Sequence, residues 1–246
     1  MKNSKDNLYI IIPAYNEEEN IEEVVKDWIG VVDKIGNSSK LVIVNDGSKD
    51  NTEKKLLSLK KKHANLEVIT KENSGHGGTV LFGYNYVLKK NANYIFQTDS
   101  DGQTIADEFW PFWEQRKDYA VIIGSRKNRE DGASRVFVTK VLKFILFLIF
   151  HVKVEDANTP FRLMSKKVLK KYIKSVPDNF NLSNVLLSVL FVYNKEKIKF
   201  IPITFRPRQG GVNSINMKKI SKIGIQAVKD FRKIKKIIKK EKKNEK

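Results

Sequence analysis

Short apolar runs and longer amphipathic segments alternate along the first half of the chain. The apolar runs predict strands at residues 8–12, 41–44, 66–70, 94–97 and 121–124. Between them, apolar residues at helical spacing predict helices at residues 21–32, 52–63 and 78–89. Such alternation is typical of βαβ units, so we expect an α/β fold with a mostly parallel central sheet. Asn16, followed by three glutamates, predicts a capped start for the first helix.

The later part of the chain has a different pattern. In the segment 136–150, 12 of 15 residues are apolar, interrupted only by Thr139, Lys140 and Lys143. A helix needs about 20 apolar residues to span a bilayer, so this segment is too short to cross one. Two alternatives stay open: a buried core helix, or an interfacial helix whose lysines reach toward water.

The distribution of charge separates a tail from the rest. The 246 residues include 47 Lys and Arg against 28 Asp and Glu, a net charge of +19 with histidines neutral. Residues 217–246 hold 13 of the basic residues and 3 of the acidic ones, and therefore contribute +10. No repeat or low-complexity linker interrupts residues 8–216, so we predict one domain over residues 1–216 and a basic tail over residues 217–246.

The tail predicts a partner as well as a helix. Its apolar residues recur at spacings of three and four, at Ile220, Ile223, Ala227, Phe231, Ile234 and Ile238. A basic amphipathic helix favours contact with an anionic membrane surface. We expect no nucleic-acid partner, because the tail offers only Phe231 for base stacking and carries no nucleic-acid motif.

Composition also limits the chemistry. The chain has no cysteine, which excludes disulfides, thiolate zinc sites and cysteine nucleophiles and is compatible with a reducing compartment. No apolar stretch with a cleavage site follows the polar residues 1–7, so we expect no signal peptide and a cytoplasmic location. His63, His76 and His151 show no ligand spacing and are expected at the surface or in packing. Any metal must therefore bind oxygen or imidazole.

Two carboxylates directly follow the predicted strand 94–97. In an extended segment, residues two apart project to the same side, so Asp99 and Asp101 converge at the carboxyl end of the strand. Open α/β sheets bind their ligands at this end. Oxygen ligands suit Mg²⁺ or Mn²⁺ bridging to a diphosphate. The alternative is a simple turn, because Asp-Gly is common turn chemistry.

Three further polar segments lie near strand ends. Asp46 offers an acceptor to a nucleobase or ribose, or its loop only caps the next helix. Tyr15 can lie against a base and Glu17 can orient neighbouring groups, or both only begin a helix. The glycine-rich segment 73–79, with Gly75, offers backbone N–H groups to phosphate, or is an ordinary helix start. It lacks the Gly-Lys-Ser/Thr ending of a Walker loop.

Together these motifs resemble family 2 glycosyltransferases of GT-A fold. The resemblance covers most of residues 8–210 and rests on Pro13-x-Tyr15-Asn16-Glu17-Glu18, Asn45-Asp46-Gly47-Ser48-x-Asp50-x-Thr52, Asn73-x-Gly75-x-Gly77-x-Thr79, Asp99-x-Asp101-Gly102-Gln103, Gly124-Ser125-Arg126 and Asp156-x-x-Thr159-Pro160-Phe161-Arg162. The pattern is similar to dolichyl-phosphate mannose synthases and their bacterial relatives. It implies a Rossmann-like GT-A fold, here with an amphipathic C-terminal helix. Asn45 stands where the family usually has Asp, which leaves the base preference open.

The resemblance implies roles for individual residues. Positions around the nucleoside are matched by Pro13, Tyr15, Glu17 and Asp46. The metal and diphosphate motif is matched by Asp99 and Asp101, and Gln103 matches a residue beside the donor sugar. Basic positions close to phosphates are matched by Arg126 and Arg162. Arg206 and Arg208 lie in a basic loop whose guanidinium groups can bind phosphate oxygens. The alternative is a solvated basic loop without a ligand.

These roles define a reaction. A nucleoside diphosphate leaving group develops charge that a divalent cation and Arg side chains neutralise. A polyprenyl phosphate acceptor is already an anion, whereas a sugar hydroxyl needs a general base. Asp156 is the candidate base, or it only orients Arg162. We expect a metal-dependent glycosyltransferase, inverting by resemblance, that moves a sugar from a nucleotide-diphosphate sugar to polyprenyl phosphate as a peripheral protein at the inner face of the membrane.

Two other functions remain as alternatives. The first is transfer to a glycan or lipid-linked sugar in cell-surface polysaccharide synthesis, which makes a base such as Asp156 necessary. The second is a non-catalytic protein that binds nucleotide sugars, against which the presence of both Asp99 and Asp101 counts.

Overall fold

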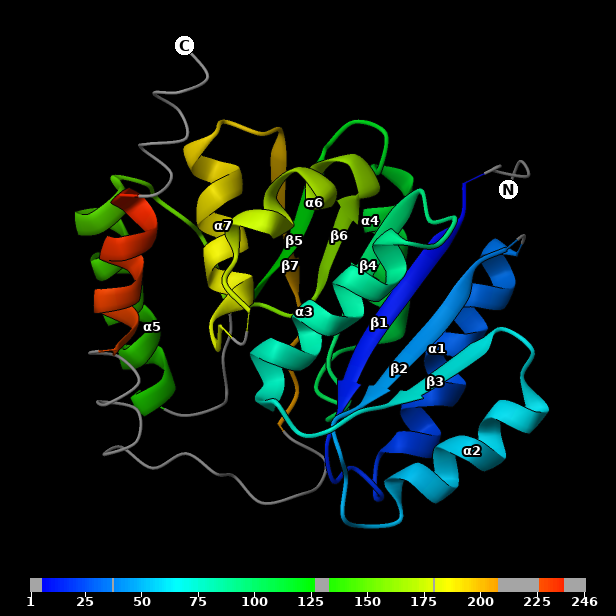
Figure 1. Cartoon of the computed structure of the whole chain (residues 1–246). Helices are drawn as coiled ribbons and strands as arrows, with labels where there is room; N and C mark the ends of the chain where they lie inside the picture. The colour runs from blue at the N-terminus through cyan, green and yellow to red at the C-terminus, as the bar shows by residue number, and fades with distance from the viewer. Residues whose placement is uncertain (1–5, 37, 127–132, 179, 208–225, 237–246) are drawn as a thin grey trace.

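A seven-stranded sheet forms the centre of the molecule (Figure 1). The computed structural model describes residues 6–36, 38–126, 133–178, 180–207 and 226–236, and in these the strand order is β3-β2-β1-β4-β6-β5-β7. The strands are β1 (Leu8–Ala14), β2 (Lys40–Asn45), β3 (Leu66–Thr70), β4 (Tyr94–Gln97), β5 (Val121–Arg126), β6 (Arg162–Ser165) and β7 (Ile198–Ile203). Only β6 runs antiparallel to its neighbours β4 and β5, so the predicted mostly parallel sheet is confirmed.

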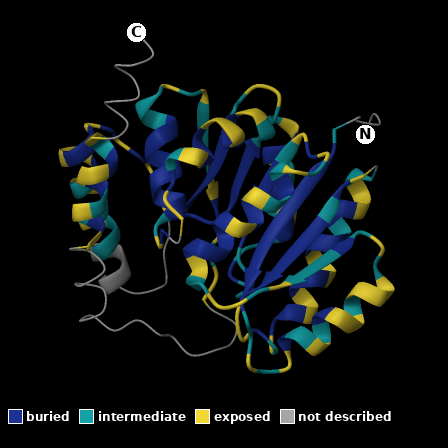
Figure 2. Cartoon of the chain, viewed as in Figure 1, coloured by how far each residue is buried: buried dark blue, intermediate teal, exposed yellow. Residues whose placement is uncertain are grey.

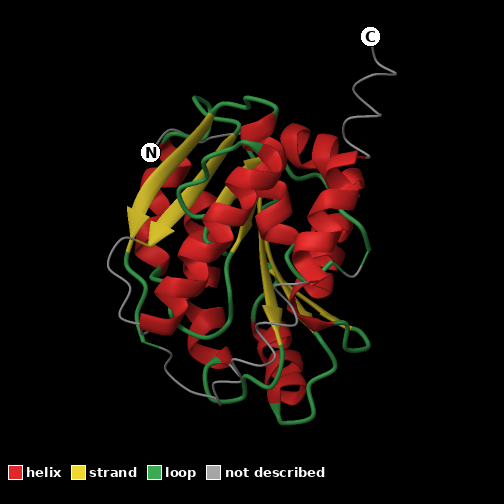
Figure 3. Cartoon of the chain, turned by 90° about the vertical axis from the view of Figure 1, so that its left-hand side faces the viewer, coloured by secondary structure: helices red, strands yellow, loops and turns green. Residues whose placement is uncertain are grey.

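Helices cover both faces of this sheet (Figure 3). One face carries α1 (Ile21–Ile35), α2 (Thr52–Lys62), the short 3₁₀ helix η1 (Ala106–Phe109) and α4 (Trp110–Glu114). The other carries α3 (Gly75–Leu88), α5 (Ala133–Phe150), α6 (Lys166–Tyr172), the 3₁₀ helix η2 (Ile173–Ser175) and α7 (Ser183–Tyr193). Residues 226–236 of the tail form a further helix.

Burial on both faces explains why β1 is almost continuously apolar. Tyr9 and Ile11 pack into the core beneath α3, whereas Leu8, Ile10 and Ile12 pack into the core beneath α1. Figure 2 shows β1 in the colour of buried residues. Parallel sheets buried on both faces typically show such runs. The alternation of side chains in β1 therefore divides one apolar segment between two cores.

The start of α1 differs from the prediction. The helix begins at Ile21 with Asn20 at the N-cap, and no side-chain capping bond is formed there. Asn16 instead has a left-handed φ of 54°. Its side-chain oxygen accepts a hydrogen bond of 2.8 Å from the backbone N–H of Lys49. Asn16 thus ties the loop after β1 to the loop after β2, and the predicted cap was wrong.

The antiparallel direction of β6 brings an additional loop to the functional edge of the sheet. In the register of the strands, Arg162 at the start of β6 pairs with Gln97 at the end of β4 and with Ile123 of β5. The segment before β6, rather than the one after it, therefore reaches the edge where β4 and β5 end. This segment contains Asp156 and Thr159.

The apolar helix α5 is buried along one side only. Its residues Leu146, Ile149 and Phe150 are buried, and the Phe150 ring packs edge-to-face on Phe231 of helix 226–236, with 5.9 Å between ring centroids. The same Phe231 ring contacts Phe180. In the part of the chain that the structure describes, no helix is long and apolar enough to cross a bilayer.

The tail helix uses its apolar residues for packing on the domain. Ala227, Phe231 and Ile234 are buried in the core of the protein, so these residues of the predicted stripe do not face a membrane surface as the sequence suggested. Ile220, Ile223 and Ile238, which belong to the same predicted stripe, lie outside the described residues, and so does Arg208.

Candidate active site

A cavity of about 1040 Å³ opens where β1, β2 and β4 end and α3 begins. It brings together most of the side chains that the sequence motifs singled out for the donor. The lining residues are Pro13, Ala14, Tyr15, Asn16, Glu17, Glu18, Glu19, Asn20, Asp46, Lys49, Asp50, Asn73, Gly75, His76, Thr79, Asp99, Ser100 and Asp101. The carboxyl ends of sheet strands are where open α/β folds bind ligands, so this cavity is the candidate active site.

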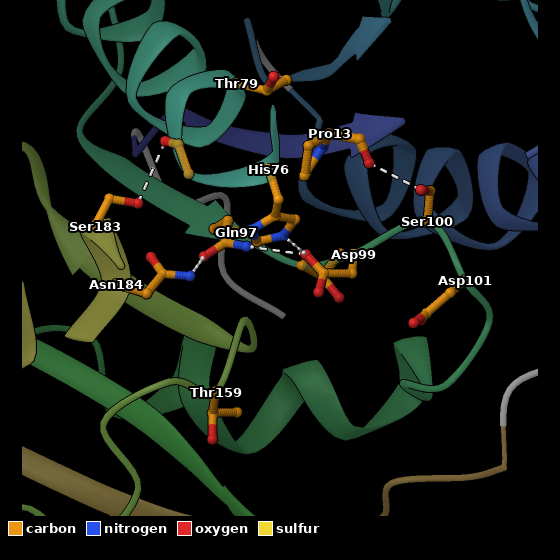
Figure 4. A network of polar contacts seen from close by, with 12 residues as sticks. Pro13, His76, Thr79, Gln97, Asp99, Ser100, Asp101, Thr159, Ser183 and Asn184 are labelled. Carbon is orange, nitrogen blue, oxygen red and sulfur yellow. Dashed lines mark hydrogen bonds and ion pairs between the residues drawn. The ribbon is translucent and has the colours of Figure 1, made fainter. Parts of the chain in front are cut away.

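Asp99 is held from two sides (Figure 4). Its Oδ1 accepts a hydrogen bond of 3.2 Å from Nε2 of Gln97 and lies 3.0 Å from Nε2 of His76. Gln97 is itself fixed, because Nδ2 of the buried Asn184 donates to its Oε1 over 2.9 Å. Tyr84 places its hydroxyl within 3.2 Å of the same Oε1. The Asp99 carboxylate is thus oriented before any ligand binds.

His76 is a pocket residue that the sequence interpretation missed. Its ring is half exposed, but it lines the cavity beside Asp99 rather than serving only packing or the surface. Desolvation lowers the pKa of His76, and the carboxylates of Asp99, Asp101 and Asp46 outweigh it and raise the pKa above its usual value. His76 places a positive charge among these carboxylates when protonated. The predicted surface position of His76 is confirmed, and the structure adds that the residue lines the cavity beside Asp99.

The acidic motif forms the turn that was one of its two interpretations. Gly102 has a left-handed φ of 70°, and Oδ1 of Asp101 accepts a hydrogen bond of 3.2 Å from the N–H of Gln103, which forms a turn. Ser100 donates to the carbonyl of Pro13 over 2.8 Å. The turn leaves the carboxylates of Asp99 and Asp101 at the wall of the cavity.

Gln103 connects the motif to the segment after β7. It is buried, and its Nε2 donates to the carbonyl of Arg206 over 2.8 Å, while the N–H of Arg206 donates back to the Gln103 carbonyl over 2.9 Å. Gln103 is not among the residues lining the main cavity. Arg206 is exposed and lines a smaller cavity of about 300 Å³, which shares Asp99 and Asn20 with the main one.

The end of the cavity next to β2 contains a paired carboxylate. Asp46 is buried, and its Oδ1 accepts hydrogen bonds from Nζ of Lys71 and, over 2.9 Å, from the N–H of Ser74. Burial raises the pKa of Asp46, but the hydrogen bonds from Lys71, Ser74 and Thr79 more than compensate and hold it below 3.8. Asp46 is therefore an ionised acceptor at neutral pH. Lys71, which sets this charge balance, was not predicted.

Asn45, which stands where the family usually has Asp, forms its side-chain hydrogen bonds with neighbouring protein groups. Asn45 is fully buried, its Oδ1 accepts the hydroxyl hydrogen of Ser48, and its Nδ2 donates to Thr70 over 3.3 Å. Asn45 does not line the cavity, whereas Asp46 does. Tyr15, 43% exposed, lies at the cavity wall, where its ring face can stack on a base.

Arg126 and Asp156 form a buried ion pair. Nε and one terminal nitrogen of Arg126 each donate to a different oxygen of Asp156 over 2.8 Å, and the guanidinium lies 5.0 Å from the centroid of the Phe205 ring. Burial raises the pKa of Asp156, but the hydrogen bonds and charge of Arg126 outweigh this effect and hold it below 3.8. Asp156 orients Arg126, not Arg162 as the sequence suggested.

Arg162 lies in the core, away from the cavity. It is fully buried, and its five N–H groups donate to the carbonyls of Thr159, Asn184 and Ala157 and to the hydroxyl of Ser188. With every donor engaged, the side chain cross-links the segment before β6 to α7. Its placement does not support the predicted contact with phosphate.

The cavity is strongly acidic in a basic protein. Its lining includes seven carboxylates, those of Glu17, Glu18, Glu19, Asp46, Asp50, Asp99 and Asp101, and the basic lining residues are Lys49 and His76. An anionic ligand needs a cation to enter such a site. Among the described residues, no three acidic or histidine side chains form a complete metal cluster. Two carboxylates completed by phosphate oxygens are, however, a common way to hold Mg²⁺.

The fold and this site define a class: α/β proteins that bind a nucleotide at the carboxyl ends of a mostly parallel sheet. The family model of glycosyl transferase family 2 matches residues 9–173, so the chain belongs to this family and is a glycosyltransferase. The resemblance inferred from the motifs is thereby confirmed.

Individual relatives agree with the family. The chain is 32% identical over 185 residues to the UDP-N-acetylglucosamine–dolichyl-phosphate N-acetylglucosaminyltransferase of Methanococcus voltae, a match that covers 66% of this chain and 71% of the relative. It is 27% identical over 224 residues to the dolichyl-phosphate beta-glucosyltransferase of Dictyostelium discoideum, covering 82% and 66% of the two chains.

A solved structure confirms the GT-A-type architecture. Glucosyl-3-phosphoglycerate synthase from Mycobacterium tuberculosis, in a complex with Mn²⁺, UDP-glucose and phosphoglyceric acid, superposes with a TM-score of 0.69 at 16% identity. The alignment covers 94% of this chain and 80% of the synthase. At this identity the likeness concerns the fold alone.

Proposed function

We propose that this glycosyltransferase moves a sugar from a nucleotide-diphosphate sugar to a polyprenyl phosphate, with a divalent cation, at the inner face of the membrane. The observation that carries the proposal is the cavity that places Asp99 and Asp101 beside Asp46 and Tyr15. Relatives whose names specify dolichyl phosphate support the acceptor class.

The donor set fits Mg²⁺ or Mn²⁺. Asp99 and Asp101 would hold the ion together with phosphate oxygens of the donor, and the ion would neutralise charge on the leaving nucleoside diphosphate. Gln97 and His76 contact Oδ1 of Asp99, so Oδ2 would be the oxygen of Asp99 that binds the ion. Tyr15 and Asp46 would hold the nucleoside, and backbone N–H groups near Gly75 would approach the diphosphate.

The hydrogen bonds and the lowered pKa of Asp156 favour a phosphate acceptor over a sugar hydroxyl. A sugar hydroxyl needs a base that can accept its proton, but Asp156 already accepts two hydrogen bonds from Arg126 and its pKa is lowered. A phosphate monoester is a nucleophile without such help. Arg126 and Asp156 line neither of the two cavities described, and the pair would then serve to keep the guanidinium fixed.

Product formation by the purified full chain tests the reaction. A panel of uridine and guanosine diphosphate sugars is offered with Mn²⁺ or Mg²⁺ and a short polyprenyl phosphate, and glycolipid is extracted into organic solvent. We expect metal-dependent glycolipid that Asp101→Ala abolishes and that the exposed control Asp118→Ala retains. Donor binding without transfer to any polyprenyl phosphate contradicts the acceptor assignment.

A single substitution distinguishes phosphate from glycan acceptors. Asp156→Asn retains one of the two oxygen acceptors for Arg126 and replaces the other by an N–H donor, so transfer to a phosphate acceptor should fall less than about tenfold. Loss of a general base costs about 100- to 10,000-fold in rate. A loss of that size in Asp156→Asn, with the donor still bound, favours the alternative of a glycan or lipid-linked sugar acceptor.

A further inference from the structure

The outward side of α5 is an unusually apolar surface. Of its large hydrophobic residues, Val141, Phe144, Phe147 and Leu148 are 40%, 62%, 43% and 55% exposed. Elsewhere in the described chain, large hydrophobics of comparable exposure are isolated, as Leu57 on α2 and Phe82 on α3 are. Contiguous exposed apolar surface on a folded protein marks a contact site, whereas scattered residues do not.

Helical geometry places these residues opposite the core contacts. Val141, Phe144 and Leu148 recur at spacings of three and four and therefore share one face of α5. Leu146, Ile149 and Phe150 occupy the opposite face and are buried. The two alternatives that the sequence left open, a core helix and an interfacial helix, thus correspond to the two faces of one helix.

Basic residues surround this apolar face. Lys140 and Lys143 are exposed on α5 itself. Helix 226–236 lies beside α5, as the contacts of Phe231 with Phe150 and of Lys235 with the carbonyl of Ile149 show. Its apolar residues Ala227, Phe231 and Ile234 are buried, and its exposed residues are Gln226 and the four basic residues Lys229, Arg232, Lys233 and Lys236, with Asp230 half-buried among them. The tail therefore contributes charge, and α5 contributes the apolar surface.

We propose that the outer face of α5 inserts into the interface of an anionic lipid bilayer, with the basic face of helix 226–236 beside it. This proposal rests on the proposed function, in which the acceptor is a lipid phosphate. Charge complementarity favours lipid over a second copy of this chain. A dimer through α5 would bring together two sets of lysines, whereas an anionic leaflet neutralises them.

Vesicle sedimentation with the full chain tests the surface. The vesicles contain phosphatidylcholine alone or with phosphatidylglycerol, and Phe144→Ser/Leu148→Ser is compared with the matched control Leu57→Ser/Phe82→Ser. We expect binding of the wild type to the anionic vesicles, at least about a tenfold lower partition for the α5 variant, and an unchanged partition for the control. Lys140→Gln/Lys143→Gln should reduce the preference for anionic lipid.

A second probe reports insertion directly. Tryptophan introduced by Phe144→Trp should be quenched by bromine-labelled acyl chains, and tryptophan introduced by Leu57→Trp should not. Equal partition of the two serine variants, or no quenching of the Phe144→Trp fluorescence above that of the control, overturns the proposal. So does a change from dimer to monomer in Phe144→Ser/Leu148→Ser without any vesicle binding by the wild type.

An activity assay in detergent tests the transfer reaction separately from vesicle binding. Transfer to a short polyprenyl phosphate dispersed in detergent should be unchanged in Phe144→Ser/Leu148→Ser, because the substituted residues lie outside the donor cavity. If the wild type binds vesicles through α5 but transfers sugar to no polyprenyl phosphate, the proposed function fails while the docking surface stands.

Discussion

Replacing Gln97 by leucine removes the buried amide that orients Asp99. The substitution conserves approximate volume but deletes the hydrogen bond from Nε2 to Asp99 Oδ1 and the acceptor used by Asn184. A hydrogen bond to a charged group contributes about 1.5–3 kcal/mol. Since His76 still contacts Asp99, we expect the lower value, which corresponds to about a tenfold loss of affinity for nucleotide with Mn²⁺.

The effect on folding has a separate origin. In Gln97→Leu the Nδ2 of Asn184 loses its buried acceptor, at a cost of about 1–3 kcal/mol in the free energy of unfolding. The Tyr84 hydroxyl lies 3.3 Å from Oδ1 of Asn184 and can donate there instead. Tyr84→Phe is therefore the matched control, because it perturbs the same network without removing a partner of Asp99.

Two measurements distinguish positioning of Asp99 from general destabilisation. Titration calorimetry with UDP and GDP, with and without Mn²⁺, gives the affinity, and urea unfolding gives the stability. We expect Gln97→Leu to lose metal-dependent nucleotide affinity and Tyr84→Phe to lose stability only. If the two variants bind the metal-nucleotide equally well, Gln97 does not act through Asp99 and this reasoning is refuted.

Other predictions concern packing, charge and pH. Gly77→Ala should destabilise the fold by about 1–3 kcal/mol, because a Cβ there would lie 2.4 Å from the carbonyl oxygen of Phe180. Gly30→Ala, which has open space around it, should not destabilise the fold, and thermal unfolding compares the two variants. Arg162→Met should lose about 3 kcal/mol or more in urea unfolding, since several buried carbonyls lose their donor, while the exposed Arg206→Met stays near the wild type. Folding lowers the pKa of Asp46 and Asp156 below 3.8, so the stability they contribute is present above that pH and is lost as the pH falls through their folded pKa values. Urea midpoints between pH 6 and pH 3 should therefore fall less steeply in Asp156→Asn than in the wild type, and an identical slope would contradict this assignment.

Local patterns were sufficient to predict most of the sheet. The strands β1, β2, β4 and β5 are mainly buried apolar runs, whereas β3 is mostly half-buried. The helices α1, α2 and α3 lie close to the segments that the 3.6-residue period predicts. The strands β6 and β7 were not predicted, and β6 is short and begins with an arginine. Its antiparallel direction follows from pairing with β4 and β5, which a local pattern does not contain.

The candidate site was predictable only where its residues follow strands directly. Asp46, Asp99 and Asp101 were found this way. The groups that set their charge and orientation come from distant segments: Lys71 lies 25 positions from Asp46, and Asn184 lies 87 positions from Gln97. An arginine in a sequence is normally read as exposed, so the burial of Arg162 among five acceptor contacts had no local signal.

The contrast between an acidic cavity and a basic exterior makes the response to ionic strength two-sided. Dissolved salt screens the repulsion between the seven cavity carboxylates and an approaching nucleotide, which favours donor entry. The same salt screens the attraction of the exposed lysines near α5 for anionic lipid, which disfavours docking. On vesicles, turnover should therefore pass through a maximum at intermediate salt, whereas in detergent, where docking is not required, only the first effect remains.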